Sequence, residues 1–328
     1  MSENVLKIKN LEVQFVVERD VAYAVNGIDL TIGKGEVVGL VGETGAGKTT
    51  TALSILRLLP NYVTRIPHGE IYFKGENLLE KSEVEMRNIR GKHISMIFQD
   101  PMTSLNPVMT VGSQIADVIK WHDRQLTKKQ VDEQVCNILE MVGIPAARRT
   151  EYPHQFSGGM KQRVVIAIAI ACNPELLIAD EPTTALDVTI QAQVIKMMRN
   201  LQKKLNSSVL MITHDLGVVA NFCDRVMIMY AGEIVESGSL EEVFDRSAKH
   251  HPYTVGLFGS IPDIASKSDR LQPIPGLMPN PSELPQGCKF HPRCPYACDC
   301  CKEGPVPVWA DGGHSIKCHL ADREEVFA

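Results

Sequence analysis

The sequence has no run of apolar residues long enough to cross a lipid bilayer. The longest candidate, residues 164–172, has nine residues, whereas a membrane-spanning helix needs roughly 18 or more. The first four residues, Met-Ser-Glu-Asn, also lack the basic and apolar regions of a signal peptide. We therefore expect a cytosolic protein, or one that is attached to a membrane only through its partners.

The sequence also lacks a strong excess of either charge. The formal net charge is −5 over 328 residues, and because nucleic-acid backbones reward basic faces, we expect no nucleic-acid partner. Hydrophobic residues make up 44% of the chain, which permits a sizeable core and argues against global disorder. The length fits about two domains.

The order of the predicted elements is typical of an α/β protein. Apolar patterns predict antiparallel strands over residues 5–16 and 20–32, and shorter strands over 37–41, 69–73, 94–98, 175–179 and 208–213. Helical patterns cover residues 110–148, 160–171 and 190–205, and a hairpin is expected over 225–237. Eleven of the 19 prolines follow residue 246, so we place a domain boundary near residue 245, followed by a segment without long helices or central strands.

A phosphate-binding loop is the clearest local signal. Between a predicted buried strand and a predicted helix the chain matches the pattern G-x-x-x-x-G-K-[ST], and the predicted nucleotide-binding residues are Gly42, Glu43, Thr44, Gly45, Ala46, Gly47, Lys48, Thr49 and Thr50. Glycines allow the backbone to approach phosphate oxygens, and the helix N-terminus attracts negative charge. Lys48 is predicted to contact the β- and γ-phosphates, and the Thr49 hydroxyl to bind Mg²⁺.

Polar residues at the ends of neighbouring predicted strands complete this site. Asp180 follows a buried strand and is predicted to hold Mg²⁺ through water, and Glu181 can reach the attacking water as a general base or an orienting group. His214 follows another strand and can contact the γ-phosphate. Gln99 can bind Mg²⁺ or position water. Taken alone, Asp180 and Glu181 also fit an ordinary acidic turn, and His214 a structural role.

A second anion-binding helix start is predicted at residues 156–163, Phe-Ser-Gly-Gly-Met-Lys-Gln-Arg. Ser157 supplies a hydroxyl, and Gly158 and Gly159 expose backbone N–H groups. Because the chain already has one phosphate loop, this motif favours a head-to-tail dimer, in which the Ser157 loop of one copy closes over the nucleotide of the other. The alternative is a glycine-rich cap on a buried helix.

These motifs, in this order, resemble the ATP-binding subunit of an ABC transporter over about residues 5–245. The resemblance rests on the phosphate loop, Gln99, residues 157–162, Asp180 with Glu181, the run Ala185, Leu186 and Asp187, and His214. It implies a P-loop NTPase core of ABC type, with an antiparallel β subdomain and a helical subdomain over about residues 100–170. It also assigns Gln162 to the signature motif and Asp187 to communication across the dimer. Phe15, or Tyr23 in second place, is the implied adenine-stacking residue.

Six of the nine cysteines lie between residues 288 and 318. In a reducing compartment such a cluster favours metal ligation over disulfides. Four of them, Cys288, Cys294, Cys301 and Cys318, are spaced x5, x6 and x16, and four thiolates can hold an iron–sulfur cluster or Zn²⁺. Further candidate ligands are Cys298, Cys300, His291, His314 and His319.

Residues 251–328 resemble the C-terminal extension of ABC importers for dipeptides and oligopeptides. The matching segments include residues 251–254, 261–262, 274–276, 287–288, 292–295 and 313–318. This resemblance implies a small, irregular, cysteine-rich C-terminal domain, with a 4Fe–4S cluster on Cys288, Cys294, Cys301 and Cys318. Because a proline-rich segment of about 80 residues buries little core, a metal group is expected to stabilise it.

Together the resemblances imply an ATPase subunit that powers peptide import from the cytoplasmic face of a membrane. The implied partners are a second ATP-binding subunit of a related sequence, two transmembrane permease subunits and, indirectly, an extracytoplasmic solute-binding protein. Alternatives are an importer for nickel or another small solute, a soluble ABC ATPase, and a metal-sensing regulator that uses ATP. The chain has one set of motifs and no sustained heptads, which disfavours the soluble ATPases of translation and DNA repair.

Overall fold

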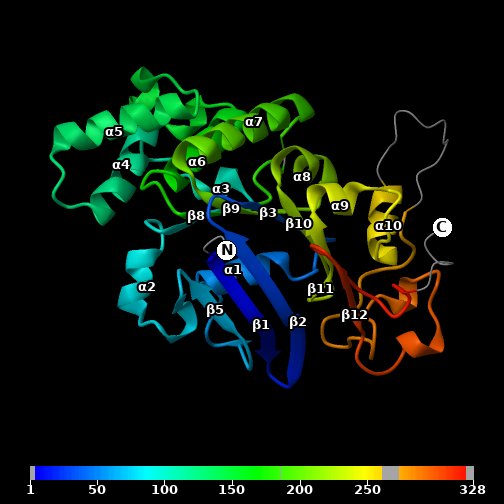
Figure 1. Ribbon diagram of the computed structural model, residues 1–328. Helices are drawn as coiled ribbons and strands as arrows, with labels where there is room; N and C mark the ends of the chain where they lie inside the picture. Colours follow the sequence, from blue (N-terminus) through cyan, green and yellow to red (C-terminus); the bar gives the residue numbers. More distant parts are fainter. Residues whose placement is uncertain (1–3, 185, 261–272, 323–328) are drawn as a thin grey trace.

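Two β-sheets organise this computed structural model, which describes residues 4–184, 186–260 and 273–322 (Figure 1). Ala185 and the segment 261–262, which carry part of the family resemblance, lie outside the described residues. The larger sheet has the strand order β12-β13-β11-β10-β3-β9-β8-β7. Its members are β3 (Val37–Val41), β7 (Ile94–Ile97), β8 (Leu176–Asp180), β9 (Ser208–Thr213), β10 (Arg225–Tyr230), β11 (Glu233–Ser239), β12 (Val308–Asp311) and β13 (His314–Lys317).

The centre of this sheet is parallel, as its apolar strands predict. Strands β10, β3, β9, β8 and β7 pair in parallel, and every residue of β3, β8 and β9 is buried. Buried parallel strands leave their carboxyl ends on one edge, where loops are free to bind ligands. This edge carries the loop after β3 and the acidic pair at the end of β8.

The smaller sheet is built on a long hairpin. Strands β1 (Asn4–Val17) and β2 (Asp20–Gly33) pair antiparallel, which confirms the two strands predicted there. Three short strands join them: β4 (Thr64–Arg65), β5 (Glu70–Phe73) and β6 (Glu76–Asn77). The inner faces of both sheets contribute to one apolar cluster, which includes Leu6, Leu30, Leu40 and Ile212. The structure thus has the antiparallel β layer that the sequence predicted beside the parallel sheet.

Helices cover the sheets and form one lobe of their own. They are α1 (Lys48–Ile55), α2 (Glu83–Ile89), α3 (Pro101–Ser104), α4 (Val111–His122), α5 (Lys128–Met141), α6 (Gly158–Ala169), α7 (Val188–Leu205), α8 (Leu216–Phe222), α9 (Leu240–Phe244) and α10 (Pro252–Gly259). Helices α4 and α5 lie together on one side of the view, opposite the C-terminal segment (Figure 1). Helix α1 ends at Ile55, and Arg57 shortly after it takes a positive φ of 51°.

The described part of the C-terminal region is joined to the larger sheet. Strand β13 pairs with β11, and β12 pairs with β13. Tyr253 and Phe290 belong to the main apolar core, while Ile316, Cys318, Leu320 and Ala321 form a small cluster of their own. The expected small, irregular domain is thus not an independent body in the described residues, because its strands continue the sheet of the preceding domain.

Candidate active site

The phosphate loop connects β3 to α1 and depends on glycine at two contacts. A Cβ atom on Gly42 would lie 2.2 Å from the carbonyl oxygen of Met229, and one on Gly47 would lie 2.4 Å from that of Ala24. Gly47 is also the N-cap of α1, with φ of 102°. A larger residue at either position would push the loop away from β10 or β2. The structure therefore explains why the loop pattern requires glycine here.

Lys48 lies inside this loop. Its side chain is buried, and Nζ donates hydrogen bonds to the carbonyl oxygens of Gly42 at 2.7 Å and Glu43 at 2.9 Å. Burial lowers the pKa of Lys48, and the carboxylates of Glu181 and Asp180 oppose this shift. The ammonium group is thus held at the centre of a glycine-rich loop, where it can meet phosphate oxygens.

Asp180 ends β8 next to the start of α1. The residue is 2% exposed and hydrogen-bonds with the Thr49 side chain, and its Oδ1 has no hydrogen-bond partner among the described residues. Burial raises the pKa of Asp180. A buried, unpartnered carboxylate oxygen beside a threonine hydroxyl is a suitable oxygen donor set for Mg²⁺. These two residues therefore fit the predicted magnesium ion.

Glu181 lies within hydrogen-bond distance of two other predicted catalytic residues, His214 and Gln99. Its Oε1 lies 3.0 Å from His214 Nδ1, and its Oε2 accepts hydrogen bonds from Gln99 at 3.2 Å and from Thr184 at 2.9 Å. Burial opposes ionisation, but the hydrogen bonds from His214 and Thr184 outweigh it and lower the pKa of Glu181. Thr184 was not predicted, although its place three residues after Glu181 was a usable signal. The carboxylate is thus ionised and oriented, as a general base needs.

The second predicted anion site lies at the N-terminus of α6. Ser157 is the N-cap, and its hydroxyl accepts the N–H of Met160 at 3.4 Å. Ser157 and Gly158 are exposed, and a Cβ atom on Gly158 would meet no described atom within 4 Å. Asp187 is the exposed N-cap of α7. This surface is open to a partner, whereas Gln162 is 1% exposed within α6 with both amide atoms unpartnered among the described residues.

The two candidates for adenine stacking lie on the β1–β2 hairpin. Phe15 is half-buried and packs against the apolar core, whereas Tyr23 is 41% exposed. The adjacent residue Ala24 touches the phosphate loop at Gly47. The hairpin thus lies beside the nucleotide site, and Tyr23 has the more accessible ring.

The thiols of the four matching cysteines lie close enough to interact electrostatically. Burial raises the pKa of Cys288 to about 12 and that of Cys294 to about 11, and the other thiols of the set add to both shifts. Cys288, Cys294 and Cys318 each accept a backbone N–H from the residue two positions later in the chain. These N–H donors lower the pKa of the thiols against the larger effect of burial, and they would stabilise thiolates that bind a metal group.

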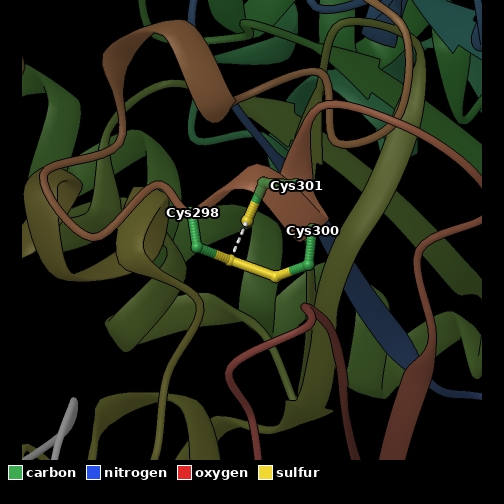
Figure 2. Close-up of side chains that lie close together, drawn as sticks. All are labelled: Cys298, Cys300 and Cys301. Carbon is green, nitrogen blue, oxygen red and sulfur yellow. Dashed lines mark hydrogen bonds between the residues drawn. A yellow bond between two sulfur atoms is a disulfide. The ribbon is translucent and has the colours of Figure 1, made fainter.

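Cys298 and Cys300 form a disulfide, and Cys298 Sγ lies 3.5 Å from Cys301 Sγ (Figure 2). The expectation that this cysteine cluster favours ligation over disulfides is therefore wrong for this pair. The reason is local, because one intervening residue leaves their Cα atoms 5.3 Å apart, which is within the usual range for a disulfide.

The loop, the buried aspartate and the ionised glutamate define a P-loop nucleotide-hydrolysing site. Comparisons with known proteins narrow this class. Residues 25–184 match the family model described as ABC transporter, and residues 235–301 match the model described as oligopeptide/dipeptide transporter, C-terminal region. The chain therefore belongs to the ATP-binding proteins of ABC transporters, a family that hydrolyses ATP.

Relatives and solved structures support this assignment over most of the chain. The oligopeptide transport ATP-binding protein AppD of Bacillus subtilis is 47% identical over 97% of each chain. The dipeptide transport ATP-binding protein DppD of the same species is 46% identical over 99% of this chain and 97% of its own. A dimeric, post-hydrolysis structure of the ATP-binding cassette MJ0796 with ADP and Pi has a TM-score of 0.64 and 27% identity, covering 72% of this chain and 98% of that one.

Across the described residues, we find no helix with both the length and the apolar character that a membrane span requires.

Proposed function

We propose that this protein hydrolyses ATP to power the import of dipeptides or oligopeptides through a membrane ABC transporter. The names of the relatives and the matching C-terminal region support peptides as the solute. In this proposal residues 1–245 form the ATP-binding domain and residues 246–328 the extension. The protein acts at the cytoplasmic face, with two permease subunits and, indirectly, an extracytoplasmic solute-binding protein as partners.

The observation that carries this proposal is the separation of two anion sites. Lys48, Asp180 and Glu181 converge at the carboxyl ends of the parallel strands, while Ser157 and Gly158 present an exposed helix N-terminus from α6. A head-to-tail pair places the Ser157 loop of one subunit over the triphosphate of the other. ATP binding then closes the pair and hydrolysis releases it. In the cell the second subunit is a related chain.

The dimer is tested with Glu181→Gln, which removes the general base and keeps the shape of the side chain. We expect this variant to bind Mg·ATP, to turn over slowly, and to elute at twice the monomer mass in size-exclusion chromatography with light scattering. Adding Ser157→Arg should return it to a monomer while Lys48 still binds nucleotide. A monomer in both variants at saturating Mg·ATP would contradict the proposal.

The solute is tested in proteoliposomes that contain the assembled transporter. Peptide-loaded solute-binding protein should stimulate ATP hydrolysis and drive peptide uptake, whereas nickel-loaded protein should do neither. Stimulation by nickel alone would replace the peptide assignment by one of the other small solutes.

We further propose that Cys288, Cys294, Cys301 and Cys318 hold a 4Fe–4S cluster. A tetrahedral zinc ion with Zn–S bonds of about 2.3 Å needs sulfur atoms within about 4 Å of each other. Among the described residues, the groups of three potential ligands within 4.8 Å are Cys298, Cys300 and Cys301, and Glu236, His250 and His314. Neither group contains three of the four matching cysteines, so no three of these thiols have sulfur atoms that all lie within 4.8 Å of one another. This arrangement supports a polynuclear cluster, whose iron atoms bind separate thiolates.

Anaerobic purification tests the cluster. We expect brown protein with about four iron atoms per chain, and loss of the colour in Cys294→Ser. Cys136→Ser, in the helical lobe, is the control and should keep its iron. Colourless protein with one zinc ion per chain would overturn the cluster assignment.

A further inference from the structure

Glu43 is the second residue of the phosphate loop, and its carbonyl oxygen, its backbone N–H and its carboxylate all form hydrogen bonds. Its carbonyl oxygen accepts hydrogen bonds from Lys48 Nζ at 2.9 Å and from the N–H of Ala46 at 3.2 Å. Its own N–H donates to the Tyr253 hydroxyl at 2.9 Å, and its carboxylate accepts from Arg293 Nη1 at 3.1 Å. The two outer partners are 210 and 250 residues away in the sequence, and both lie in the C-terminal region.

Arg293 is fixed in place by its surroundings. Its side chain is 6% exposed, its Nε donates to the carbonyl oxygen of Pro275 at 2.8 Å, and its guanidinium carbon lies 5.8 Å from the ring centre of Tyr230. A planar guanidinium held on several sides is a directional donor rather than a mobile surface charge. Arg293 therefore fixes the Glu43 carboxylate, which is 30% exposed.

Tyr253 is equally well fixed. It is fully buried at the start of α10, and its ring packs edge-on against Tyr230, with centroids 4.7 Å apart. Phe290 completes the aromatic group at 5.1 Å from Tyr230 and 5.5 Å from Tyr253. A rigid tyrosine in such a cluster holds its hydroxyl at a constant position. Here that hydroxyl accepts a backbone N–H of the phosphate loop.

We propose that Arg293 and Tyr253 are positioning residues for ATP binding. They act through Glu43, whose carbonyl oxygen helps to hold the Lys48 ammonium group in place. Ordering a flexible loop on binding costs conformational entropy, and a loop that is already ordered avoids this cost. The C-terminal contacts hold the backbone of Glu43, and hence the carbonyl oxygen that receives the Lys48 ammonium, before the triphosphate arrives. Their loss weakens nucleotide affinity and leaves Glu181, Gln99 and His214 in place.

The test uses the full-length protein and two measurements: the Kd of Mg·ATP, from displacement of a fluorescent ATP analogue, and steady-state KM and kcat. We expect Arg293→Met to raise Kd and KM about tenfold and Tyr253→Phe about threefold, with kcat within twofold of the wild type. Arg293→Lys keeps the charge but not the fork of donors, so it should recover part of the affinity. Lys302→Met and Tyr296→Phe, at exposed sites of the same region, should not change Kd.

A double-mutant cycle separates positioning from general damage. Glu43→Gln should weaken binding about as much as Arg293→Met, and the double variant should be no weaker than either single variant, because both remove the same ion pair. Fully additive effects would overturn the proposal, as would wild-type affinity in both Arg293→Met and Tyr253→Phe. If Arg293→Met does not fold, Tyr253→Phe and Glu43→Gln decide the question, since the first removes one hydroxyl and the second one charge, and both keep the shape of the side chain.

Discussion

The chemistry of the site depends on a few side chains that share one carboxylate. Glu181 has a positive φ of 47°, a conformation that is uncommon for residues other than glycine and that recurs at functional sites. It receives hydrogen bonds from Gln99 and Thr184, and His214 lies within hydrogen-bond distance. The turn after β8 thus orients the carboxylate before any substrate is bound.

His214→Ala tests the orientation of Glu181. Because the hydrogen bond with His214 helps to lower the pKa of Glu181, its loss should raise that pKa, and the acid limb of the kcat–pH profile should move to higher pH. We also expect kcat at neutral pH to fall about 100-fold with little change in the Kd of ATP. His68→Ala, at an exposed site, is the control. An unshifted acid limb would show that His214 does not act through Glu181.

Lys48→Ala tests the phosphate loop itself. The variant loses a buried ammonium group that is hydrogen-bonded to the loop carbonyls. It therefore also loses the charge-assisted contacts of this group with phosphate. We expect the Kd of Mg·ATP to rise about 100-fold in the displacement assay, while Lys34→Ala, at an exposed position, keeps the wild-type value. Equal binding by both variants would contradict the assignment of the loop.

For individual residues, the sequence predicts those that belong to a local motif of the site, and it does not predict those that reach the site from a distant part of the chain. Lys48, Asp180, Glu181, Gln99 and His214 were predicted because each follows a buried strand, and parallel strands end on one edge. Arg293 and Tyr253 could not be predicted, because no local pattern links them to Glu43 across more than 200 residues. Only the folded packing of the C-terminal region brings them to the loop.

Among the secondary-structure elements, a buried charged group joins β11, β13 and the start of α10. Glu236 Oε1 lies 2.7 Å from His250 Nδ1 and 2.9 Å from His314 Nε2. His250 Nε2 also contacts the carbonyl oxygen of Asp245 at 2.8 Å. A carboxylate and a carbonyl both accept hydrogen bonds, so both nitrogens of His250 carry protons and the ring is a cation. We call Glu236, His250 and His314 the buried triad.

The pH dependence of the buried triad follows from the signs of its pKa shifts. Burial opposes the charges, but the hydrogen bonds with the histidines lower the pKa of Glu236 to about 2, and the bond to Glu236 raises the pKa of His250. The contribution of Glu236 to the stability of the fold is present at pH values above its ordinary pKa of 4.5, and it is lost as the pH falls toward 2. The contribution of His250 to stability is complete at pH values below its ordinary pKa of 6.5, and it is lost as the pH rises through its raised pKa.

His250→Gln should therefore destabilise the protein more at pH 6 than at pH 9. We expect the free energy of unfolding to fall by about 3 kcal/mol at pH 6, because a buried carboxylate loses its cationic partner. Urea unfolding at both pH values measures the difference. Neighbouring His251 is held neutral, since burial lowers its pKa to about 4, and it should not contribute in this range. The same loss at both pH values would contradict a charged His250.

The predicted elements of the ATP-binding domain are confirmed where the pattern is long or fully apolar, as in β1, β2, β3 and β9. Strands β12 and β13 were missed, because each has four residues and they follow a proline-rich segment. Pairing of β13 with β11 and of β12 with β13 supplies the hydrogen bonds that such short strands need. Their existence is a property of the tertiary fold, which local propensity does not report.

For the whole molecule, the contacts of Arg293 connect two proposed sites. Arg293 directly precedes Cys294 in the chain, and its guanidinium holds the phosphate loop through Glu43. If both proposals hold, we expect a change in the geometry of the cysteine site to reach the nucleotide site through one peptide unit and one side chain. In this proposal the described part of the C-terminal region acts on ATP binding through its contacts with Glu43.

Removal of the proposed cluster tests this connection. Anaerobic chelation of iron should raise the Kd of Mg·ATP several-fold in the wild type, because the backbone around Cys294 loses its anchor. In Arg293→Met, where the contact is already absent, the same treatment should have little effect. The displacement assay measures both proteins with and without iron. A wild-type Kd that does not respond to iron removal would rule out the coupling.

The pairing of β13 with β11 also has a consequence during synthesis. Ser237 and Ser315, whose hydroxyls lie 2.9 Å apart across these strands, are separated by 78 residues. At a translation rate of about 5–20 residues per second, β13 is synthesised roughly 4–16 s after β11. During that interval the nascent chain carries an open strand edge, which invites pairing with another copy. Pairing between nascent copies on one polysome is therefore a route to misassembly of this ATPase.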